Sequence, residues 1–365
     1  MTTPERHSRR AFLQGRAAAR ALADKTQELV DAATARMELA IPSCSELHIH
    51  ASRRAMACEF AVQFHASEEG HSDEIMEAFD LIESLEARMT VYRDQSEVIE
   101  INQRAAKGPV VVEASLFSLL ALAGKLYQQT NGAFDITSSP LSRVWGFLHR
   151  KGRVPDEEEI AEALAYVGFD RLRLDAIDQS VFFLKPGMEI NLNSIGKGYA
   201  LDQVAAWLKE CGLTDYLWHG GSSSVLARGQ NRADPRRAWT LGLRNPLDPG
   251  RRLAEFHLRD QSLGTAGGAT QFFEFEGKRY SHLLDPRTGW PAEGVYTSTV
   301  IAPTAAEADA LATAFYVMGV EEAAQYCAKH PEIGAVLVCP ADEPSEVAVH
   351  AYGLEAEDWT LLVAT

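Results

Sequence analysis

The chain has 365 residues, of which 46% are hydrophobic and 24% charged, and its formal net charge at pH 7 is −16. This length allows one large domain or two smaller ones around a sizeable core. The net charge argues against nucleic acid or an anionic membrane surface as the general partner, because either would repel the protein.

The first 45 residues predict a polar, helix-prone arm, and residues 46–365 are expected to form one domain. Within the arm, the segment SRRAFLQG, from Ser8 to Gly15, resembles a twin-arginine export signature. The apolar stretch that an export signal needs does not follow, because Arg16 and Arg20 interrupt the alanine-rich segment after it. We therefore expect a cytoplasmic protein, with export through this signature as the alternative.

Helices and strands are interleaved along the rest of the chain. Residues 72–92 predict an amphipathic helix, because apolar residues such as Ile75 and Phe79 recur three or four positions apart. The other expected helices cover residues 116–129, 198–211 and a segment from Ala305 onward, and the expected strands cover residues 55–66, 171–193 with a turn at Pro186-Gly187, 239–245, 251–260, 271–285 and, last, 333–340. Several strand pairs look like hairpins, which favours an α+β fold over a doubly wound parallel sheet.

The stretch NLNSIGKGYALD (residues 191–202) places Gly196, Lys197 and Gly198 where a strand-like segment runs into a helix pattern. A P-loop would need glycine at position 191, and a dinucleotide fingerprint would need glycine or alanine at position 201, so neither motif is present. Small residues nevertheless let backbone N–H groups approach an anion, and the helix N-terminus and Lys197 add positive charge. The pattern indicates either an anion site or an ordinary strand–helix joint with an exposed lysine.

The segment TAAEADALATAFYVMG (residues 304–319) predicts a well-defined helix start, because Thr304 and Glu307 form a capping box. Asp309 and Thr313 are four positions apart and therefore share one face of that helix. A carboxylate and a hydroxyl at this spacing can hold one hard cation, and Mg²⁺ takes its other oxygen ligands from backbone, water and substrate phosphate. The alternative is a solvent-facing aspartate and a helix-buried threonine.

Two further segments carry candidate groups. His282 precedes the turn-forming sequence DPRTG (residues 285–289) and is either a general base near neutral pH or a structural residue on its strand. The segment TNGAFDITSSPLSRVWGF (residues 130–147) combines glycine, aromatic residues and aspartate in a loop. This loop either lines the site of a flat aromatic ligand or is simply well packed.

From Met56 to Val336 the sequence resembles the ApbE-type FAD:protein FMN transferases. The resemblance is carried by seven segments in the order of the family: MACEFAV, LEARMTVYRDQSEVIEIN, GAFDITSSPLSRVWGF, NSIGKGYALD, HGGSSSVLARG, HLLDPRTGWP and STVIAPTAAEADALATAFYVMG. It covers most of the chain, and the agreement in order makes a chance match very improbable.

The resemblance implies both a fold and an activity. The fold would be a two-lobed, T-fold-like α+β architecture, with antiparallel sheets flanked by helices and the flavin in the cleft. The activity would be the Mg²⁺-dependent transfer of FMN from FAD to a threonine hydroxyl of an acceptor protein, with release of AMP. The anion at Lys197 would then be the pyrophosphate of FAD. The acceptor would be a separate protein, such as a redox or electron-transfer subunit.

The resemblance also implies roles for individual residues. Mg²⁺ would be held by the backbone carbonyl of Ser194, by Asp309 and by Thr313. The positions that correspond to flavin-binding residues are Met56, Tyr92, Ala133, Phe134, Asp135, Asn191, Lys197, His282 and Leu283. Of these, His282 matches the base proposed for the threonine hydroxyl, and Lys197 and Asp309 would complete the catalytic set.

Some positions depart from the family pattern. Asn191 stands where aspartate is common, and Ala266 replaces a hydroxyl-bearing residue after the central strands. These changes bear on the affinity for FAD more than on the type of reaction. Two alternatives remain open at this point: an FAD pyrophosphatase, in which water replaces the threonine, and a flavin-binding protein without turnover.

Overall fold

The computed structural model describes residues 48–149, 151–268 and 271–362. The expected arm at residues 1–45, with its export-like segment from Ser8 to Gly15, lies outside these ranges. The described residues combine helices with antiparallel sheets, so the predicted α+β class is confirmed. A domain that begins at residue 46 stays a prediction.

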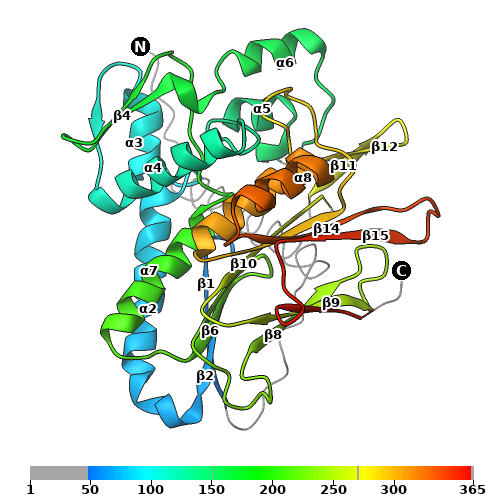
Figure 1. Ribbon diagram of the computed structural model, residues 1–365. Coiled ribbons are helices and arrows are strands. Elements are labelled where there is room, and N and C mark those ends of the chain that lie inside the picture. Colours follow the sequence, from blue (N-terminus) through cyan, green and yellow to red (C-terminus); the bar gives the residue numbers. More distant parts are fainter. Residues whose placement is uncertain (1–47, 150, 269–270, 363–365) are drawn as a thin grey trace, which may run out of the picture.

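An eight-stranded antiparallel sheet occupies the centre of the molecule (Figure 1). Its strand order is β1-β2-β6-β7-β10-β13-β14-β15. The strands are β1 (His48–Ala55), β2 (Cys58–His65), β6 (Tyr216–Gly220), β7 (Ser224–Arg228), β10 (Ser262–Gly267), β13 (Thr297–Ala302), β14 (Gly334–Pro340) and β15 (Val347–Tyr352). The strand β7, which begins at the turn after β6, lies near the middle of the sheet.

Helices cover one face of this sheet and a second sheet covers the other (Figure 1). The helices are α2 (Ser72–Met89), α7 (Gly196–Glu210) and α8 (Ala305–Lys329), and the second sheet, in the order β16-β9-β8, consists of β8 (Trp239–Arg244), β9 (Arg252–Leu258) and β16 (Trp359–Leu361). In β14, Leu337 packs into the core on the helix side, whereas Val336 and Val338 pack under the second sheet. Because both faces are buried, the sequence of β14 is a continuous apolar run and not an alternating one.

A smaller lobe lies above the central sheet in Figure 1. It contains α3 (Glu97–Arg104), α4 (Ala114–Gln129), α5 (Ser139–Val144), α6 (Glu157–Leu164) and a sheet in the order β3-β5-β4, with β3 (Val110–Val111), β4 (Leu172–Asp175) and β5 (Ser180–Phe183). A separate hairpin, β11 (Phe272–Phe275) and β12 (Lys278–Ser281), lies beside it, and short 3-10 turns occupy Ala66–His71, Phe147–His149 and Phe169–Arg171. Among the described residues, β11 and β12 pair only with each other.

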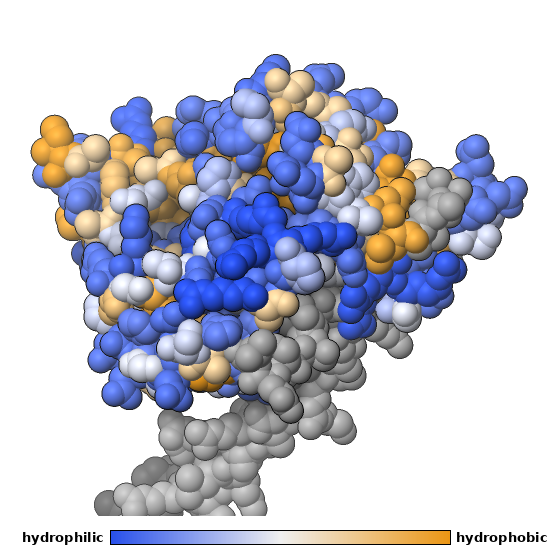
Figure 2. Space-filling model, turned by 60° about the horizontal axis from the view of Figure 1, so that its bottom comes forward, coloured by the Kyte–Doolittle hydropathy of each residue, from blue (hydrophilic) through white to orange (hydrophobic). Residues whose placement is uncertain are grey.

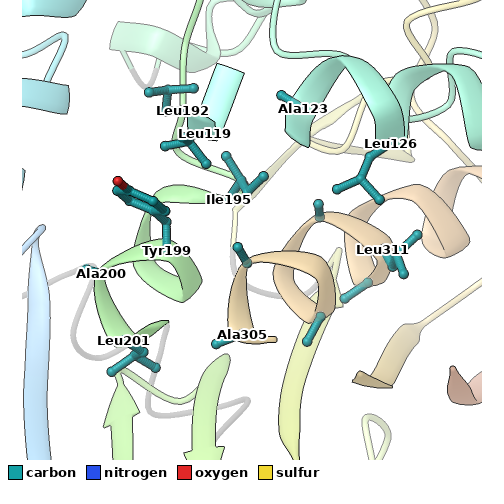
Figure 3. Close-up of a cluster of buried hydrophobic side chains, with 14 of the residues drawn as sticks. Leu119, Ala123, Leu126, Leu192, Ile195, Tyr199, Ala200, Leu201, Ala305 and Leu311 are labelled. Carbon is teal, nitrogen blue, oxygen red and sulfur yellow. The ribbon is translucent and has the colours of Figure 1, made fainter. Parts of the chain in front are cut away.

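The lobe and the central sheet are joined by a buried contact of three helices (Figure 3). Leu119, Ala123 and Leu126 form the apolar stripe of α4 at positions i, i+4 and i+7. They face Ile195, which precedes α7, and Leu311 of α8, and each of these five residues is at most 1% exposed. This contact fixes the starts of α7 and α8 relative to the lobe.

The predicted helices are confirmed, with small shifts at their ends. Helix α2 buries Ile75 and Phe79 as its apolar pattern requires. Helix α7 ends before Gly212, whose φ of 88° is the left-handed conformation that glycine adopts readily after a helix. Thr304 caps α8 by accepting a hydrogen bond from the N–H of Glu307 at 3.3 Å.

The expected strand pair at residues 171–193 differs from the structure. The hairpin turn lies between β4 and β5, where the side chain of Asp175 accepts the N–H of Ile177 at 2.8 Å, and Pro186-Gly187 follows the second strand. The stretch before Lys197 is not a strand, because the side chain of Asn102 pairs with both backbone groups of Ile190, at 2.8 and 3.0 Å, in place of a neighbouring strand. The lysine therefore follows a turn and not a strand.

Two other strand predictions need correction. Met56 and Ala57, expected within a strand, form the turn between β1 and β2 with φ of 49° and 61°. The strand at residues 333–340 is not the last, because β15 and β16 follow it. Both later strands are short or half-exposed, so their apolar pattern is weak.

Figure 2 shows a face on which hydrophilic residues predominate and hydrophobic residues form separate patches. No helix in the part of the chain that the structure describes combines the length and the apolar character needed to cross a bilayer.

Two glycines in the first turn of α7 allow a test of the packing. A Cβ on Gly198 would lie 2.0 Å from the carbonyl oxygen of Ala305, whereas a Cβ on Gly196 would meet nothing closer than 3.8 Å. We expect Gly198→Ala to lower the free energy of unfolding by about 3 kcal/mol or more, and Gly196→Ala to change it by less than about 1 kcal/mol. Urea unfolding of both variants checks this, and equal destabilisation would contradict the close approach of α7 and α8.

Candidate active site

A cavity of about 660 Å³ lies between α7 and α8 on one side and α5 with its preceding loop on the other. The predicted site residues that line it are Tyr92, Ala133, Phe134, Asp135, Asn191, Ser194, Lys197, His282, Leu283, Asp309 and Thr313. Met56 is not among the described residues that line the cavity, since it lies in the turn between β1 and β2 and packs against the main core. The structure thus brings together nearly all of the predicted set, from segments far apart in sequence.

Helices α7 and α8 each supply a carboxylate to the first turn of the other. The Asp309 side chain of α8 accepts the N–H of Gly198 at 2.8 Å, and the Asp202 side chain of α7 accepts the N–H groups of Ala305 and Ala306 at 2.8 and 2.9 Å. These N–H groups have no partner inside their own helices, and each helix N-terminus also attracts a negative charge. The two helices are therefore locked together at their first turns.

The position of Asp309 also depends on β10. A Cβ on Gly264 of β10 would lie 2.3 Å from the carbonyl oxygen of Ala308 and 2.6 Å from the nitrogen of Asp309. Glycine at this point lets the backbone of α8 approach the sheet closely. Asp309 is consequently held between α7, β10 and the start of β7, and only 8% of it is exposed, so the solvent-facing alternative is wrong.

Burial raises the pKa of Asp309 to about 6, although Lys197 and the hydrogen bonds from Ser224 and Gly198 favour the charged form. Both of these hydrogen bonds reach the same carboxylate oxygen, Oδ2. The other oxygen remains for a further ligand. A buried carboxylate that is ionised at neutral pH and has an unused oxygen at a cavity is suited to bind a cation.

Thr313 and Ser194 complete an oxygen-rich corner beside Asp309. The Thr313 hydroxyl donates to the backbone carbonyl of Asp309 at 3.3 Å, which leaves the lone pairs of its oxygen for a cation. Ser194 lies four residues before Gly198, so its carbonyl would accept the N–H of Gly198 in a regular helix. That N–H donates to Asp309 instead, which leaves the carbonyl of Ser194 without this hydrogen bond. Within the described ranges no cluster of three or more His, Cys, Asp or Glu side chains occurs. Asp135 and Asp309 are the described carboxylates that line the cavity, and Asp309 is the one at this corner. That donor set fits Mg²⁺, which commonly uses one or two carboxylates together with substrate phosphates.

Lys197 lies on the α7 side of this corner and lines the cavity. Its amino group donates a hydrogen bond to the hydroxyl of Ser223. Lys197 therefore stands in the first turn of α7 and lines the cavity.

His282 follows β12 directly and is oriented by Gln271. Its Nδ1 lies 2.9 Å from the backbone carbonyl oxygen of Gln271, so Nδ1 carries a proton and Nε2 is the basic nitrogen. Burial lowers the pKa of His282 below its usual value, so the imidazole is neutral at pH 7. The ring of Phe147 packs against it at 6.4 Å between centroids. A neutral, oriented imidazole at a cavity wall has the form that a general base requires.

Asp135 has a structural part in the loop before α5. Its carboxylate accepts hydrogen bonds from the N–H and hydroxyl of Thr137, at 2.8 and 2.7 Å, and from the N–H of Phe169 at 3.2 Å. Burial raises the pKa of Asp135 to about 6. These bonds hold the cavity side of the loop, with Ala133 and Phe134, in one conformation.

Asn191 and Tyr92, which both line the cavity, are connected through Asn193. The side chain of Asn191 accepts the N–H of Asn193 at 2.9 Å, and the side chain of Asn193 donates to the hydroxyl of Tyr92 at 2.7 Å. Asn191 therefore shapes the turn before α7 without a charge. Tyr92 is 67% exposed, so its ring is accessible from solvent.

The sequence patterns did not single out Asp202, Ser223, Ser224 or Gln271. Ser224 donates to Asp309 at 2.8 Å and Ser223 receives Lys197. One signal was available for these serines, because the segment HGGSSS places small polar residues directly after a strand. The signal for Asp202 was an acidic residue within an otherwise apolar helix stretch. The hydrogen bond from His282 to the backbone of Gln271 leaves no trace in the sequence.

The fold and the cavity define an α+β protein with a lysine, a buried carboxylate and an oriented histidine around one ligand site. Comparisons with known proteins agree with this description. The family model described as "ApbE family" matches residues 56–337. The chain belongs to the ApbE family.

Curated relatives cover most of the chain. It is 32% identical over 258 residues to the FAD:protein FMN transferase of Haemophilus influenzae, covering 68% of this chain and 74% of that protein. It is 30% identical over 318 residues to the FAD:protein FMN transferase of Treponema pallidum, covering 84% of each chain. Both alignments extend well beyond a single motif.

Solved structures show the same architecture. The flavin transferase ApbE of Vibrio cholerae superposes with a TM-score of 0.73 at 26% identity, over 84% of this chain and 97% of that one. The ApbE protein of Thermotoga maritima gives a TM-score of 0.74 at 26% identity, with the same coverage.

The raised pKa of Asp309 gives a test of its environment. Between about pH 4 and pH 6 the native carboxyl binds its proton more tightly than the unfolded one, so the wild-type protein loses stability as the pH rises through this window. Asn cannot ionise. We expect Asp309→Asn to gain about 1–3 kcal/mol relative to the wild type between pH 4 and pH 7 in urea unfolding without metal.

Mg²⁺ provides the control for this measurement. Added at pH 7, it should stabilise the wild type and leave Asp309→Asn unchanged, because a cation that binds only the native state shifts the equilibrium toward it. A stability difference between the two proteins that does not vary with pH would contradict the assignment.

Proposed function

We propose that this protein is a Mg²⁺-dependent FAD:protein FMN transferase, which moves FMN from FAD to a threonine hydroxyl of an acceptor protein and releases AMP. The observation that carries the proposal is the single cavity in which Lys197, Asp309, Thr313 and His282 meet. Its volume lies within the usual range for ligand sites. The curated relatives are named FAD:protein FMN transferase, which supports the transfer of FMN from FAD to a protein.

The reaction needs charge neutralisation and positioning more than covalent chemistry from the protein. Lys197 and the N-terminus of α7 offset the negative charge of the pyrophosphate. Mg²⁺ held by Asp309, Thr313 and the Ser194 carbonyl would supply further positive charge at the pyrophosphate oxygens. The loop with Ala133, Phe134 and Asp135 and the exposed ring of Tyr92 provide walls for the flavin.

His282 supplies the base. Its Nε2 accepts the proton of the threonine hydroxyl, while Nδ1 stays bound to the carbonyl of Gln271. The threonine oxygen forms a bond to the phosphorus of the FMN moiety, the bridging P–O bond breaks, and AMP leaves with its phosphate. Leu283, next to His282 on the cavity wall, contributes apolar contact to the flavin.

The acceptor and the location belong to the same proposal. The acceptor is a separate protein with a threonine in an accessible segment. A redox or electron-transfer subunit fits this description, because covalently bound FMN is a redox group.

We propose a cytoplasmic location, with export through the segment from Ser8 to Gly15 as the alternative. Fractionation of cells that produce the full chain distinguishes the two.

A direct assay tests the activity. Incubation with FAD, Mg²⁺ and a panel of candidate acceptors should yield an acceptor band with flavin fluorescence in a denaturing gel. We expect Asp309→Ala to lower the initial rate by about a hundredfold or more, because the proposed cation site loses the one carboxylate that the described residues place there. Asp178→Ala, in the exposed turn between β4 and β5, is the matched control and should match the wild type.

The products separate the alternatives. Release of AMP and FMN without an acceptor would instead identify an FAD pyrophosphatase. Tight FAD binding without AMP formation, unaffected by Asp309→Ala, would identify a flavin-binding protein without turnover.

The pH profile tests His282. Because its pKa lies below the usual 6.5, the basic form is fully present above about pH 7, so the transfer rate should be flat from pH 7 to 8.5 and fall only at more acidic pH. Asp309 titrates near pH 6, but saturating Mg²⁺ should move its effect to lower pH and leave that of His282 in place. His282→Gln should lose the transfer and keep FAD binding. A rate that still rises between pH 7 and 8 would contradict a neutral histidine base.

A further inference from the structure

The turn between β6 and β7 contacts both charged groups of the cavity corner. It contains Ser222 and Ser223, and Ser224 is the first residue of β7. Ser223 accepts a hydrogen bond from the amino group of Lys197, and the adjacent Ser224 donates one to Asp309 at 2.8 Å. Two neighbouring serines therefore hold the ammonium group of Lys197 in α7 and the carboxylate of Asp309 in α8.

The turn is rigid enough to fix these two positions. The backbone carbonyl of Ser223 accepts the N–H of Thr265 at 2.8 Å, which ties the turn to β10. Ser224 is fully buried, and it pairs with Gly264 of β10 and with Gly220 of β6. The two hydroxyls therefore extend from a backbone held on both sides.

Lys197 and Asp309 would otherwise attract each other. Both line the same cavity, and opposite charges in a partly buried site attract strongly. Lys197 bonds to Ser223 instead, and the Oδ2 atom of Asp309 is occupied by Ser224 and Gly198. An ion pair between lysine and aspartate would occupy the oxygen that a cation needs.

We propose that Ser223 and Ser224 are positioning residues that hold Lys197 and Asp309 apart, so that the carboxylate stays open to a divalent cation. This inference rests on the cation site of the proposed function and assigns a task to residues outside its ligand set. Ser224 acts through Asp309, and Ser223 acts through Lys197.

The test measures cation binding and not turnover. Mn²⁺, which has a free-ion signal in electron paramagnetic resonance, is titrated into the full chain with FAD saturating for each variant. Removal of a residue that orients a metal ligand commonly weakens metal binding 10- to 100-fold, so we expect Ser224→Ala to weaken Mn²⁺ binding by about tenfold. Ser224→Cys has a side chain of similar size with a weak S–H donor, so its affinity for Mn²⁺ should lie between those of the wild type and Ser224→Ala. This second variant shows that the weaker binding does not come from a folding defect.

The chain offers a matched control. Ser262 of β10 is also fully buried and faces β7, but its hydroxyl has no hydrogen-bond partner among the described residues. Ser262→Ala should therefore bind Mn²⁺ within about twofold of the wild type, since it removes a buried hydroxyl without touching Asp309.

A double-mutant cycle distinguishes separation of charges from simple support. If Ser224 keeps Asp309 away from Lys197, the loss caused by Ser224→Ala should shrink to less than about threefold in a Lys197→Met background. The inference would be overturned if Ser224→Ala weakened Mn²⁺ binding equally with Lys197 and with Met at position 197. It would also be overturned if Ser224→Ala and Ser262→Ala bound Mn²⁺ with the same affinity. If the wild type itself binds no Mn²⁺ with FAD present, the cation site of the proposed function fails instead.

Discussion

The exchange of capping carboxylates between α7 and α8 is the constraint on which the site depends. Asp309 binds the start of α7 and Asp202 binds the start of α8. Burial raises the pKa of both carboxyl groups to about 6, so each is ionised at neutral pH only at a cost. The helix N-termini offset part of this cost, because their free N–H groups and partial positive charge favour an anion. The position of the reactive corner is thus set by the packing of two helices.

The surrounding sheet adapts to this pair of helices. Gly198 and Gly264 allow backbones to approach where any side chain would collide. The start of β7 and the turn before it bring serine hydroxyls to the same point, and His282 comes to the cavity from the end of the β11–β12 hairpin. The lysine, the aspartate and the histidine therefore come from separate elements, which lets each side chain keep its own electrostatic environment. A reaction that must neutralise a pyrophosphate and also deprotonate a hydroxyl requires such a separation.

Local patterns predicted the parts of the fold that local physics controls. The helices α2 and α8 follow from apolar spacing and from the Thr304 cap, and the pair Asp309 and Thr313 follows from helix geometry. The hairpin turn after Asp175 was misplaced, because Pro186-Gly187 is the stronger turn signal although an Asx turn forms earlier. The functions of Asp202 and Ser224 exist only through contacts between distant segments, so no pattern within either segment reveals them. The strand β14 was predicted correctly from its continuous apolar run, although burial on both faces removes the alternation that marks a half-buried strand.

The reciprocal caps have a symmetry that restricts how such a chain can change. In α7 the donor Gly198 and the acceptor Asp202 are four residues apart, and in α8 the donor Ala305 and the acceptor Asp309 have the same spacing. One residue inserted within either interval would turn the carboxylate by about 100° around its helix, away from its partner. Length variation can accumulate in the exposed turns that follow these helices, at Gly212 and Pro331, but not within either of these two single turns.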